Sequence, residues 1–261
     1  MSIDVTHDAG FFSCCSVRLH YIVEYINKHG KYPYDVNSSR SFRMYKKIPR
    51  DITFDFFNHY GDTNEEICSH VNYHWIKEHE NYKLLDFKNI LPIVTKFFTP
   101  TKEMWNISFK LQNKYKICAS DCIGLYFRGT DKKIETPIGD FQTYLQKLND
   151  LRATVPDTTK IIIQTDTAQF ADFIKEQNIP NIIFIEENSV SYRDSGIHNE
   201  KTPAENYTDI KNLFATFLLL SKCKIFICSS GNCSIWSVFF RGSANNVYQL
   251  LNNKWQSEIT Q

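Results

Sequence analysis

The chain has 261 residues, of which 42% are hydrophobic and 23% charged, and its formal net charge at pH 7 is +1. A chain of this length can bury a substantial core, so we expect a globular protein of one large domain or two small ones. The near-neutral charge argues against a nucleic-acid binder that works through bulk positive charge, and no nucleic-acid partner is expected.

The N-terminal segment and the cysteines bear on the compartment. Residues 1–8 show no basic segment followed by an apolar core, and no window reaches eighteen apolar residues, which predicts a protein without a secretion signal or membrane span. The eight cysteines form no CxxC pair, and several lie in apolar runs, as reduced thiols do. We therefore expect a cytoplasmic location.

The first half of the chain has a loosely defined α/β pattern. Its expected elements are a helix over 11–29, a strand over 31–36, an extended segment over 51–57, a helix from Thr63 to about 79, an extended segment over 84–94 and a helix from Thr99 to about 115. Gly30 supplies the stop for the first helix, and Thr63-Asn-Glu-Glu66 is a capping-box pattern that opens the second. Thr99-Pro100 places proline at the first position of the third.

From Cys122 onward strands and helices alternate regularly. The expected elements are strands over 122–127, 160–164, 181–185, 224–228 and 246–250, and helices from Asp140 and over 168–177, 207–221 and 233–241. Such alternation predicts a parallel sheet with helices on both faces. The change in rhythm suggests a boundary, with an N-terminal lobe over 1–118 and a C-terminal lobe over 119–261. The connection over 186–206 is long enough to suggest a functional loop.

Three of these strands end in polar clusters, namely Arg128-Gly-Thr-Asp131, Gln164-Thr-Asp166 and Ser229-Ser-Gly-Asn232. If the strands are parallel neighbours, the clusters meet at one edge of the sheet, where ligands bind in open α/β folds. The guanidinium of Arg128 suits phosphate oxygens, and the turn before the last helix can hold an anion on free backbone N–H groups. Alternatively, Arg128 pairs with a neighbouring carboxylate, and Asp166 and the serines cap helices.

A zinc site is a further alternative in the first half. His70 and His74 are spaced as i and i+4 on the predicted second helix, with Cys68 nearby. No HExxH motif is formed, and a surface helix with several histidines needs no metal. No metal is therefore expected.

The segment Tyr126-Phe-Arg-Gly-Thr-Asp-Lys132 resembles the His-x-Arg-Arg-Thr-Asp-Lys stretch of the α1,6-fucosyltransferases and the bacterial nodulation fucosyltransferase. Further pieces resemble the same family in the same order: Ile161–Asp166, Glu187–Ser191 with Gly196–Asn199, and Phe217–Ser230, with a weaker similarity at His7–Ser13. The resemblance covers roughly residues 120 to 240 and extends to the protein O-fucosyltransferase superfamily.

The resemblance implies an α/β, GT-B-like fold with two α/β lobes and a doubly wound parallel sheet in the C-terminal lobe. It implies an inverting, metal-independent glycosyltransferase that needs no cofactor and moves a sugar from a nucleotide-diphosphate sugar to a hydroxyl of a glycan acceptor. The residues that it singles out for catalysis are Arg128, Asp131 and Glu135. Those that it singles out for donor binding are Tyr126, Arg128, Asp166, Thr216, Ser229, Ser230, Gly231 and Asn232.

Two positions depart from the family at the nucleotide base. Tyr126 replaces the family's histidine, and Thr216 falls where an aspartate helps to hold guanine. GDP-fucose is the family's donor, and a UDP-sugar such as UDP-xylose is the alternative. Glu135 lies one residue from the family's proposed base. A catalytically inactive nucleotide- or sugar-binding module is the rival function, and an interaction protein, which would bind no nucleotide, is a third.

Overall fold

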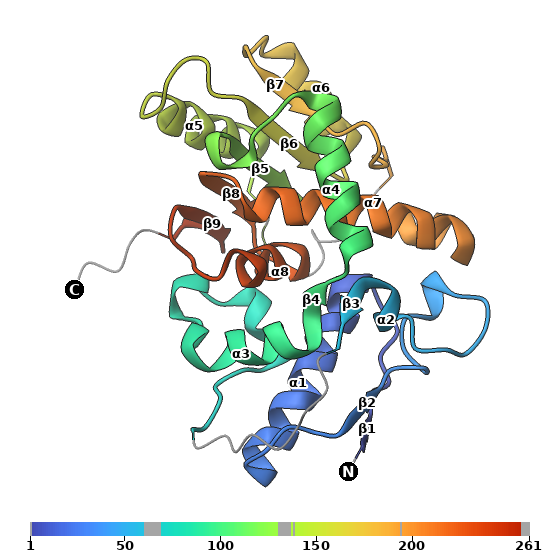
Figure 1. Cartoon of the computed structure of the whole chain (residues 1–261). Coiled ribbons are helices and arrows are strands. Elements are labelled where there is room, and N and C mark those ends of the chain that lie inside the picture. Colours follow the sequence, from blue (N-terminus) through green and yellow to red (C-terminus); the bar gives the residue numbers. More distant parts are fainter. Residues whose placement is uncertain (1, 60–68, 130–136, 138, 194, 257–261) are drawn as a thin grey trace.

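The computed structural model describes residues 2–59, 69–129, 137, 139–193 and 195–256 (Figure 1). In the first half, its elements are β1 (Ser2–Asp4), α1 (Phe11–His29), β2 (Asp35–Asn37), η1 (Arg43–Tyr45), α2 (Thr53–Phe56), β3 (Phe57–Asn58), η2 (Trp75–His79), η3 (Tyr82–Leu84), α3 (Phe87–Phe98), β4 (Thr99–Pro100) and α4 (Lys102–Tyr115), where η marks a 3₁₀ helix.

In the second half, the elements are η4 (Ala119–Asp121), β5 (Ile123–Phe127), α5 (Phe141–Arg152), β6 (Ile161–Thr165), α6 (Ala168–Glu176), β7 (Ile182–Phe184), η6 (Ile197–Glu200), α7 (Pro203–Ser221), β8 (Ile225–Ser229), α8 (Asn232–Arg241), β9 (Val247–Leu251) and β10 (Lys254–Trp255). The expected strands and helices of this half are confirmed within a few residues. The hairpin partner β10 was not expected.

A six-stranded sheet organises the second half, in the order β10-β9-β8-β5-β6-β7. All neighbouring strands from β9 to β7 run parallel, and only β10 is antiparallel to its neighbour. The side chains of β5 alternate between two cores: Leu125 and Phe127 pack with α5 and α6, whereas Tyr126 packs with α7 and α8. The predicted parallel sheet with helices on both faces is confirmed.

The order of the strands places a topological switch point at the centre of the sheet. The chain proceeds from β5 through β6 to β7 on one side, then crosses over to β8 and β9 on the other. The two strands flanking this reversal, β5 and β8, pair in register, with Tyr126 opposite Cys228. In open α/β sheets, a crevice for ligands forms beyond the carboxyl ends of such strands.

The first half has less sheet than expected. Among the described residues it holds two two-stranded pairs, β1 with β2 and β3 with β4, beside the helices α1, α3 and α4. Helix α1 ends as predicted at Gly30, which adopts the left-handed conformation with φ of 66°. The core of this half is continuous with that around α7 and α8, since Phe11 and Phe12 contact Phe214. The division into lobes at residue 118 stays a prediction.

Several segments of the first half were predicted wrongly. Thr99 and Pro100 form the strand β4 rather than the start of a helix, and α4 begins at Lys102. Residues 84–94 were expected to be extended, but most of them belong to α3, because Ile90, Ile93 and Phe97 recur at helical spacing and are buried together. Pro92 is tolerated inside this helix on its exposed side. The segment 51–57 contains the single-turn helix α2.

The predicted helix over 63–79 is also wrong for the residues that the structure describes, from 69 onward. Thr63–Glu66 lie outside the described residues, and residues 69–74 form no helix before the short η2.

In the second half, helix α7 begins at Pro203, four residues earlier than expected, because Thr202 and Glu205 form a capping box. Within the described part of the chain, no helix is long and apolar enough to cross a membrane.

Candidate functional site

A hollow of about 690 Å³ lies at the carboxyl edge of the sheet, where the crevice is expected. Its wall is formed by strand ends, by the segment before α7, by the residues that open α1 and by the segment around η2. The lining residues are Asp8, Ala9, Gly10, Phe11, Phe12, Ser13, Met44, Tyr45, Trp75, Glu78, His79, Tyr126, Arg128, Gln164, Asp166, Asn188, Ser189, Gly196, Ile197, His198, Asn199, Asn206, Asp209, Ile210, Leu213, Asn232 and Cys233. The hollow is therefore built by both halves of the chain.

The three polar clusters that follow β5, β6 and β8 meet at this edge. The backbone N–H of Arg128 donates to the Ser229 hydroxyl (3.1 Å), and the N–H of Gly129 donates to the Asp166 carboxylate (3.0 Å). The Arg128 side chain lines the hollow, with Nε 3.8 Å from Asp166 Oδ2. The convergence predicted from the strand ends is thus present. Asp131 and Glu135 lie outside the described residues, and their catalytic roles stay predictions.

Gly129 is required by the space beside it. A Cβ there would lie 2.6 Å from the Phe127 ring and 2.6 Å from the hydroxyl of Thr167. The Phe127 ring is itself fixed, since it stacks on Phe170 at 4.2 Å and is fully buried. A larger residue at position 129 would therefore require the Phe127 ring or the Thr167 side chain to shift.

The alternative assignment, in which Asp166 caps the helix that follows it, is not supported by the structure. Thr167 is the N-cap residue of α6 and makes no side-chain capping bond. Asp166 instead accepts from Gly129 N and from the Thr167 hydroxyl, and so ties the end of β6 to the turn after β5. Its carboxylate positions the segment that carries Arg128.

The turn before α8 is held from inside the protein. The Ser230 hydroxyl donates to Leu250 O and accepts from the Gln249 side chain, while Ser229 accepts from Arg128 N. Both serine side chains are buried, and neither is among the residues lining the hollow. Direct contacts of Ser229 and Ser230 with a donor stay predictions.

Gly231 completes this turn and is fixed by Tyr82 of η3. The Tyr82 hydroxyl accepts from Gly231 N (2.9 Å) and lies 3.1 Å from Gly231 O, to which it can donate. The first three amides of α8 belong to Asn232, Cys233 and Ser234, and a helix offers such N–H groups no partner of its own. The N-terminus of α8, which is the positive end of the helix dipole, therefore lies at the hollow, which Asn232 and Cys233 line.

The Asn232 side chain connects α8 to α1. Its Oδ1 accepts from the Ser16 hydroxyl (2.6 Å), which in turn accepts from Trp236 Nε1 (3.0 Å). All three side chains are buried. Asn232 Oδ1 therefore fixes the two helices, α1 and α8, that flank the hollow.

Tyr126, one of the two positions assigned to the nucleotide base, is almost completely buried. Its ring packs edge-on against Phe217 at 4.8 Å, and only 4% of the residue is exposed. Burial raises the pKa of Tyr126 well above its ordinary value, and the hydroxyl contacts Cys233. Burial also raises the pKa of the Cys233 thiol, against the opposing charge of Arg128, so both groups stay neutral.

Thr216 lies beneath the wall of the hollow. It is fully buried, donates to Asn212 O and accepts from the Asn188 side-chain amide at 2.8 Å. The same amide donates to Gln164 Oε1 at 2.6 Å. Thr216 therefore acts through Asn188, which lines the hollow, and a direct contact between Thr216 and a base stays a prediction.

The wall contributed by the first half was not predicted residue by residue. Tyr45 accepts from Phe11 N at 2.9 Å, and Trp75 is 38% exposed at the rim. Glu78 is buried, with its carboxylate 3.2 Å from His79 Nε2. One signal for this wall in the sequence was the weak similarity at His7–Ser13, a segment that leads into α1 beside the hollow.

The zinc alternative is not supported. His70 and His74 lie in a stretch without regular secondary structure rather than on a helix, and the His74 ring packs edge-on against that of His20 with centroids 4.3 Å apart. Among the described residues, no three histidine, cysteine or acidic side chains converge as a metal site would require. Cys68 lies outside the described residues. Independence from metal stays a prediction.

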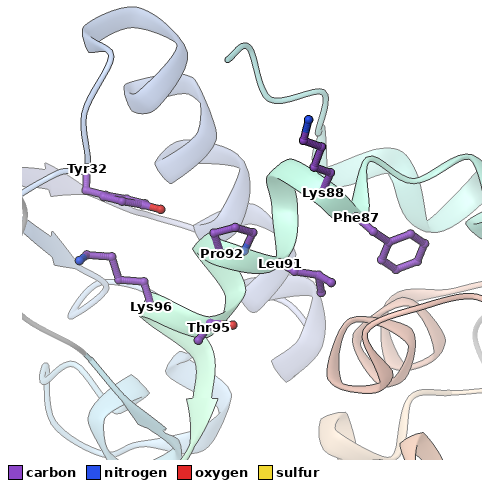
Figure 2. A pocket seen from close by; sticks show the side chains of 7 residues that line it. All are labelled: Tyr32, Phe87, Lys88, Leu91, Pro92, Thr95 and Lys96. Carbon is purple, nitrogen blue, oxygen red and sulfur yellow. The ribbon is translucent and has the colours of Figure 1, made fainter. Parts of the chain in front are cut away.

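A second hollow, of about 750 Å³, lies on the outer side of α3 (Figure 2). Its lining residues other than Tyr32 all lie on α3, and Figure 2 shows the Tyr32 ring on the side of Pro92 and Lys96. Its ionisable lining groups other than Tyr32 are Lys88 and Lys96, and Lys96 Nζ lies 4.7 Å from the centre of the Tyr32 ring. It shares no lining residue with the hollow at the sheet edge, which remains the candidate site.

Comparison with known proteins identifies the fold. No family model and no curated protein matches the sequence. Solved structures match along almost the whole chain: NodZ α-1,6-fucosyltransferase co-crystallised with GDP is 12% identical, with 98% of this chain and 97% of that chain covered and a TM-score of 0.61. The same enzyme soaked with GDP-fucose is 13% identical, with 92% of both chains covered and a TM-score of 0.57. Fucosyltransferase NodZ from Bradyrhizobium gives 11% identity, 98% and 97% coverage and a TM-score of 0.57.

These matches show that the chain has a fucosyltransferase-like glycosyltransferase fold, as the resemblance in the sequence implied. The mixed α/β architecture with its six-stranded sheet is that of the matched structures.

Proposed function

We propose that the protein is a glycosyltransferase that uses a nucleotide-diphosphate sugar as donor. The observation that carries this proposal is the meeting of Arg128 and the N-terminus of α8 in one hollow at the switch point of the sheet. A charged fork of donors and a helix N-terminus together suit a diphosphate. NodZ, whose fold this chain shares, was co-crystallised with GDP and soaked with GDP-fucose, which supports a donor of this class.

In the proposed reaction, an acceptor hydroxyl attacks the anomeric carbon as the bond to the diphosphate breaks. Negative charge then develops on the leaving diphosphate, and groups that bind it more strongly as the charge grows lower the barrier. Arg128 and the first amides of α8 are those groups. The transfer inverts the anomeric configuration and needs neither a metal nor another cofactor.

A carboxylate takes the proton of the acceptor hydroxyl in this scheme. Glu135 is the proposed base and Asp131 an assisting carboxylate, both by resemblance. Asp166 has a different role, because its Oδ1 accepts from Gly129 N and the Thr167 hydroxyl while its Oδ2 faces Arg128 Nε. It holds the Arg128 segment in place.

The nucleotide base is proposed to bind along the wall formed by Gln164 and Asn188, with Thr216 behind it. GDP-fucose is the first candidate donor and UDP-xylose the alternative, since Tyr126 and Thr216 replace the family's base-contacting residues. Both amide hydrogens of Asn188 are used by Gln164 and Thr216, so its Oδ1, which has no hydrogen-bond partner among the described residues, is the group left to accept from either base. A hydroxyl of a glycan is the proposed acceptor.

A catalytically inactive nucleotide- or sugar-binding module is the second candidate function. It is favoured by the burial of Tyr126 and Thr216 at the two base positions. Such a module would bind nucleotide diphosphates through the same Arg128 and α8 contacts without turnover.

The test has two stages. A thermal-shift screen against GDP, UDP, ADP and their sugars should give the largest stabilisation with GDP or UDP compounds, because bound ligand stabilises the folded state. Hydrolysis of the stabilising sugar nucleotide, followed by release of the nucleotide, should then be detectable. Binding without hydrolysis or transfer would favour the inactive module, and no binding to any of these compounds would contradict both functions.

A further inference from the structure

Arg18 of α1 is wholly buried and only partly paired. Its Nη1 donates to Val36 O at 2.9 Å and to the Ser38 hydroxyl at 2.5 Å, and lies 3.4 Å from Asp51 Oδ2. Arg18 is 0% exposed. One end of the guanidinium is therefore anchored to β2 and to the segment that leads into α2.

The other donors of the guanidinium lie on one edge. Nε and Nη2 are both buried, and neither has a hydrogen-bond partner among the described residues. Their N–H groups point in the same direction, as a fork that matches two oxygens or one small anion. Arg50 on the surface binds both oxygens of Asp55 through its other, end-on fork, with Nη1 and Nη2 at 3.0 and 2.6 Å from them.

Asp51 cannot turn to fill the Arg18 edge. Its Oδ1 accepts from the backbone and the hydroxyl of Thr53, and its Oδ2 accepts from Ser38 N at 2.7 Å. His59, after β3, offers a third unused group, because its Nε2 is buried without a described partner. The positive charge of Arg18 adds to burial in lowering the pKa of His59.

We propose that Nε and Nη2 of Arg18, together with Nε2 of His59, bind one small anion of halide or carboxylate chemistry inside the first half of the chain. Buried donors are rarely left without partners, and an anion satisfies the Arg18 fork while balancing its charge. Arg18 and His59 are not among the residues lining the hollow at the sheet edge. This site is thus independent of the proposed glycosyltransferase reaction.

Binding of the anion is coupled to a proton on His59. Burial, and then the charge of Arg18, lower the pKa of His59 to about 4, so it is neutral without the anion. The other charged or titratable groups that act on the pair are Asp51, Asp35 of β2 and Cys15 of α1. An anion beside the ring raises this pKa, so affinity increases by up to about tenfold per pH unit below the raised value.

Bromide is the direct probe, because its anomalous scattering locates it in a crystal of the wild-type protein. Crystals soaked in sodium bromide at about pH 5 are expected to show a peak within hydrogen-bond distance of Arg18 Nε and Nη2. Peaks confined to surface lysines would mean an adventitious ion only and would contradict the proposal, as would a water at this position in the presence of bromide. This readout needs no variant and no substrate.

A solution experiment separates the site from a general salt effect. At one ionic strength, chloride should raise the melting temperature relative to gluconate, which is too large for a buried site, and the increase should be larger at pH 5 than at pH 8. Arg18→Lys keeps the charge facing Asp51 but removes the fork, so it should abolish the response, and His59→Gln should abolish its pH dependence. Arg50→Lys is the matched control and should respond as the wild type does. Equal melting temperatures in the two salts at both pH values would overturn the proposal.

Discussion

The hydroxyl of Tyr82 lies 2.9 Å from the backbone nitrogen of Gly231, although 149 residues separate the two in the sequence. This contact fixes the turn that opens α8 from the side of the first half. The proposed diphosphate site thus depends on a residue outside the sheet that carries Arg128.

Tyr82→Phe removes this hydroxyl and leaves the ring. The buried amide of Gly231 then has no acceptor, so we expect the free energy of unfolding to fall by about 1–3 kcal/mol and the affinity for GDP or UDP to fall with it. Denaturant unfolding and calorimetric titration measure the two effects. Tyr34→Phe, at a residue 80% exposed, should change neither. Unchanged nucleotide affinity in Tyr82→Phe would show that the turn keeps its geometry without this contact.

Gly129→Ala tests the space beneath the Arg128 segment. The new Cβ would meet Phe127 and Thr167 at 2.6 Å each, so we expect a loss of about 1–3 kcal/mol of stability and a displaced Arg128. Lys110→Ala, at an exposed residue of α4 that does not line the hollow, is the control. Thermal stability and donor hydrolysis should both decline in the Gly129 variant alone. A variant with the stability and turnover of the wild type would mean that the turn has room for a side chain.

Much of the second half could be predicted from the sequence, because its buried strands are continuous apolar runs and its helices carry an apolar stripe. The polar clusters at the strand ends therefore pointed to the correct edge of the sheet. Hydrogen bonds between distant side chains could not be predicted in this way. Thr216 appeared as a candidate base contact, yet its partner Asn188 lies 28 residues earlier in the sequence, and only the fold joins them. The first half was harder because α3, with Pro92 inside it, has short apolar stretches that also suit a strand.

Thr216→Val keeps the shape of the side chain and removes the hydroxyl that holds Asn188. We expect stability to fall by about 1 kcal/mol and nucleotide affinity by roughly fivefold, since a hydrogen bond of this kind contributes about 0.5–1.5 kcal/mol. Titrations with guanosine and uridine should show the same loss, because Asn188 is proposed to face the base. Thr95→Val on the exposed side of α3 serves as control. A loss confined to stability would remove Asn188 from the nucleotide site.

The stability of the protein in chloride-free buffer should depend on pH through His59. Its pKa in the folded state is about 4, below the usual value of 6.5, so the unfolded state binds the proton more readily. Stability is therefore complete above about pH 6.5 and decreases as the pH falls, by up to about 3 kcal/mol at pH 4. His7 and His20, whose pKa values are lowered mainly by burial, act in the same direction. His59→Gln should flatten the profile. If His59→Gln loses as much stability at low pH as the wild type does, His59 is not the group responsible.

The central claim is that Arg128 binds the diphosphate of a donor. Arg128→Ala should keep the melting temperature, because the structural bond to Ser229 comes from the backbone N–H of residue 128. Arg128→Lys should recover little, since lysine cannot reproduce the planar fork. Arg40→Ala, at an exposed arginine, is the control.

The most direct test is a calorimetric comparison of nucleoside and nucleoside diphosphate binding to the wild type and to Arg128→Ala. Charge-assisted hydrogen bonds contribute about 1.5–3 kcal/mol each, so we predict a loss of tenfold or more for GDP or UDP and no change for guanosine or uridine. Equal diphosphate affinity in the two proteins would contradict the account.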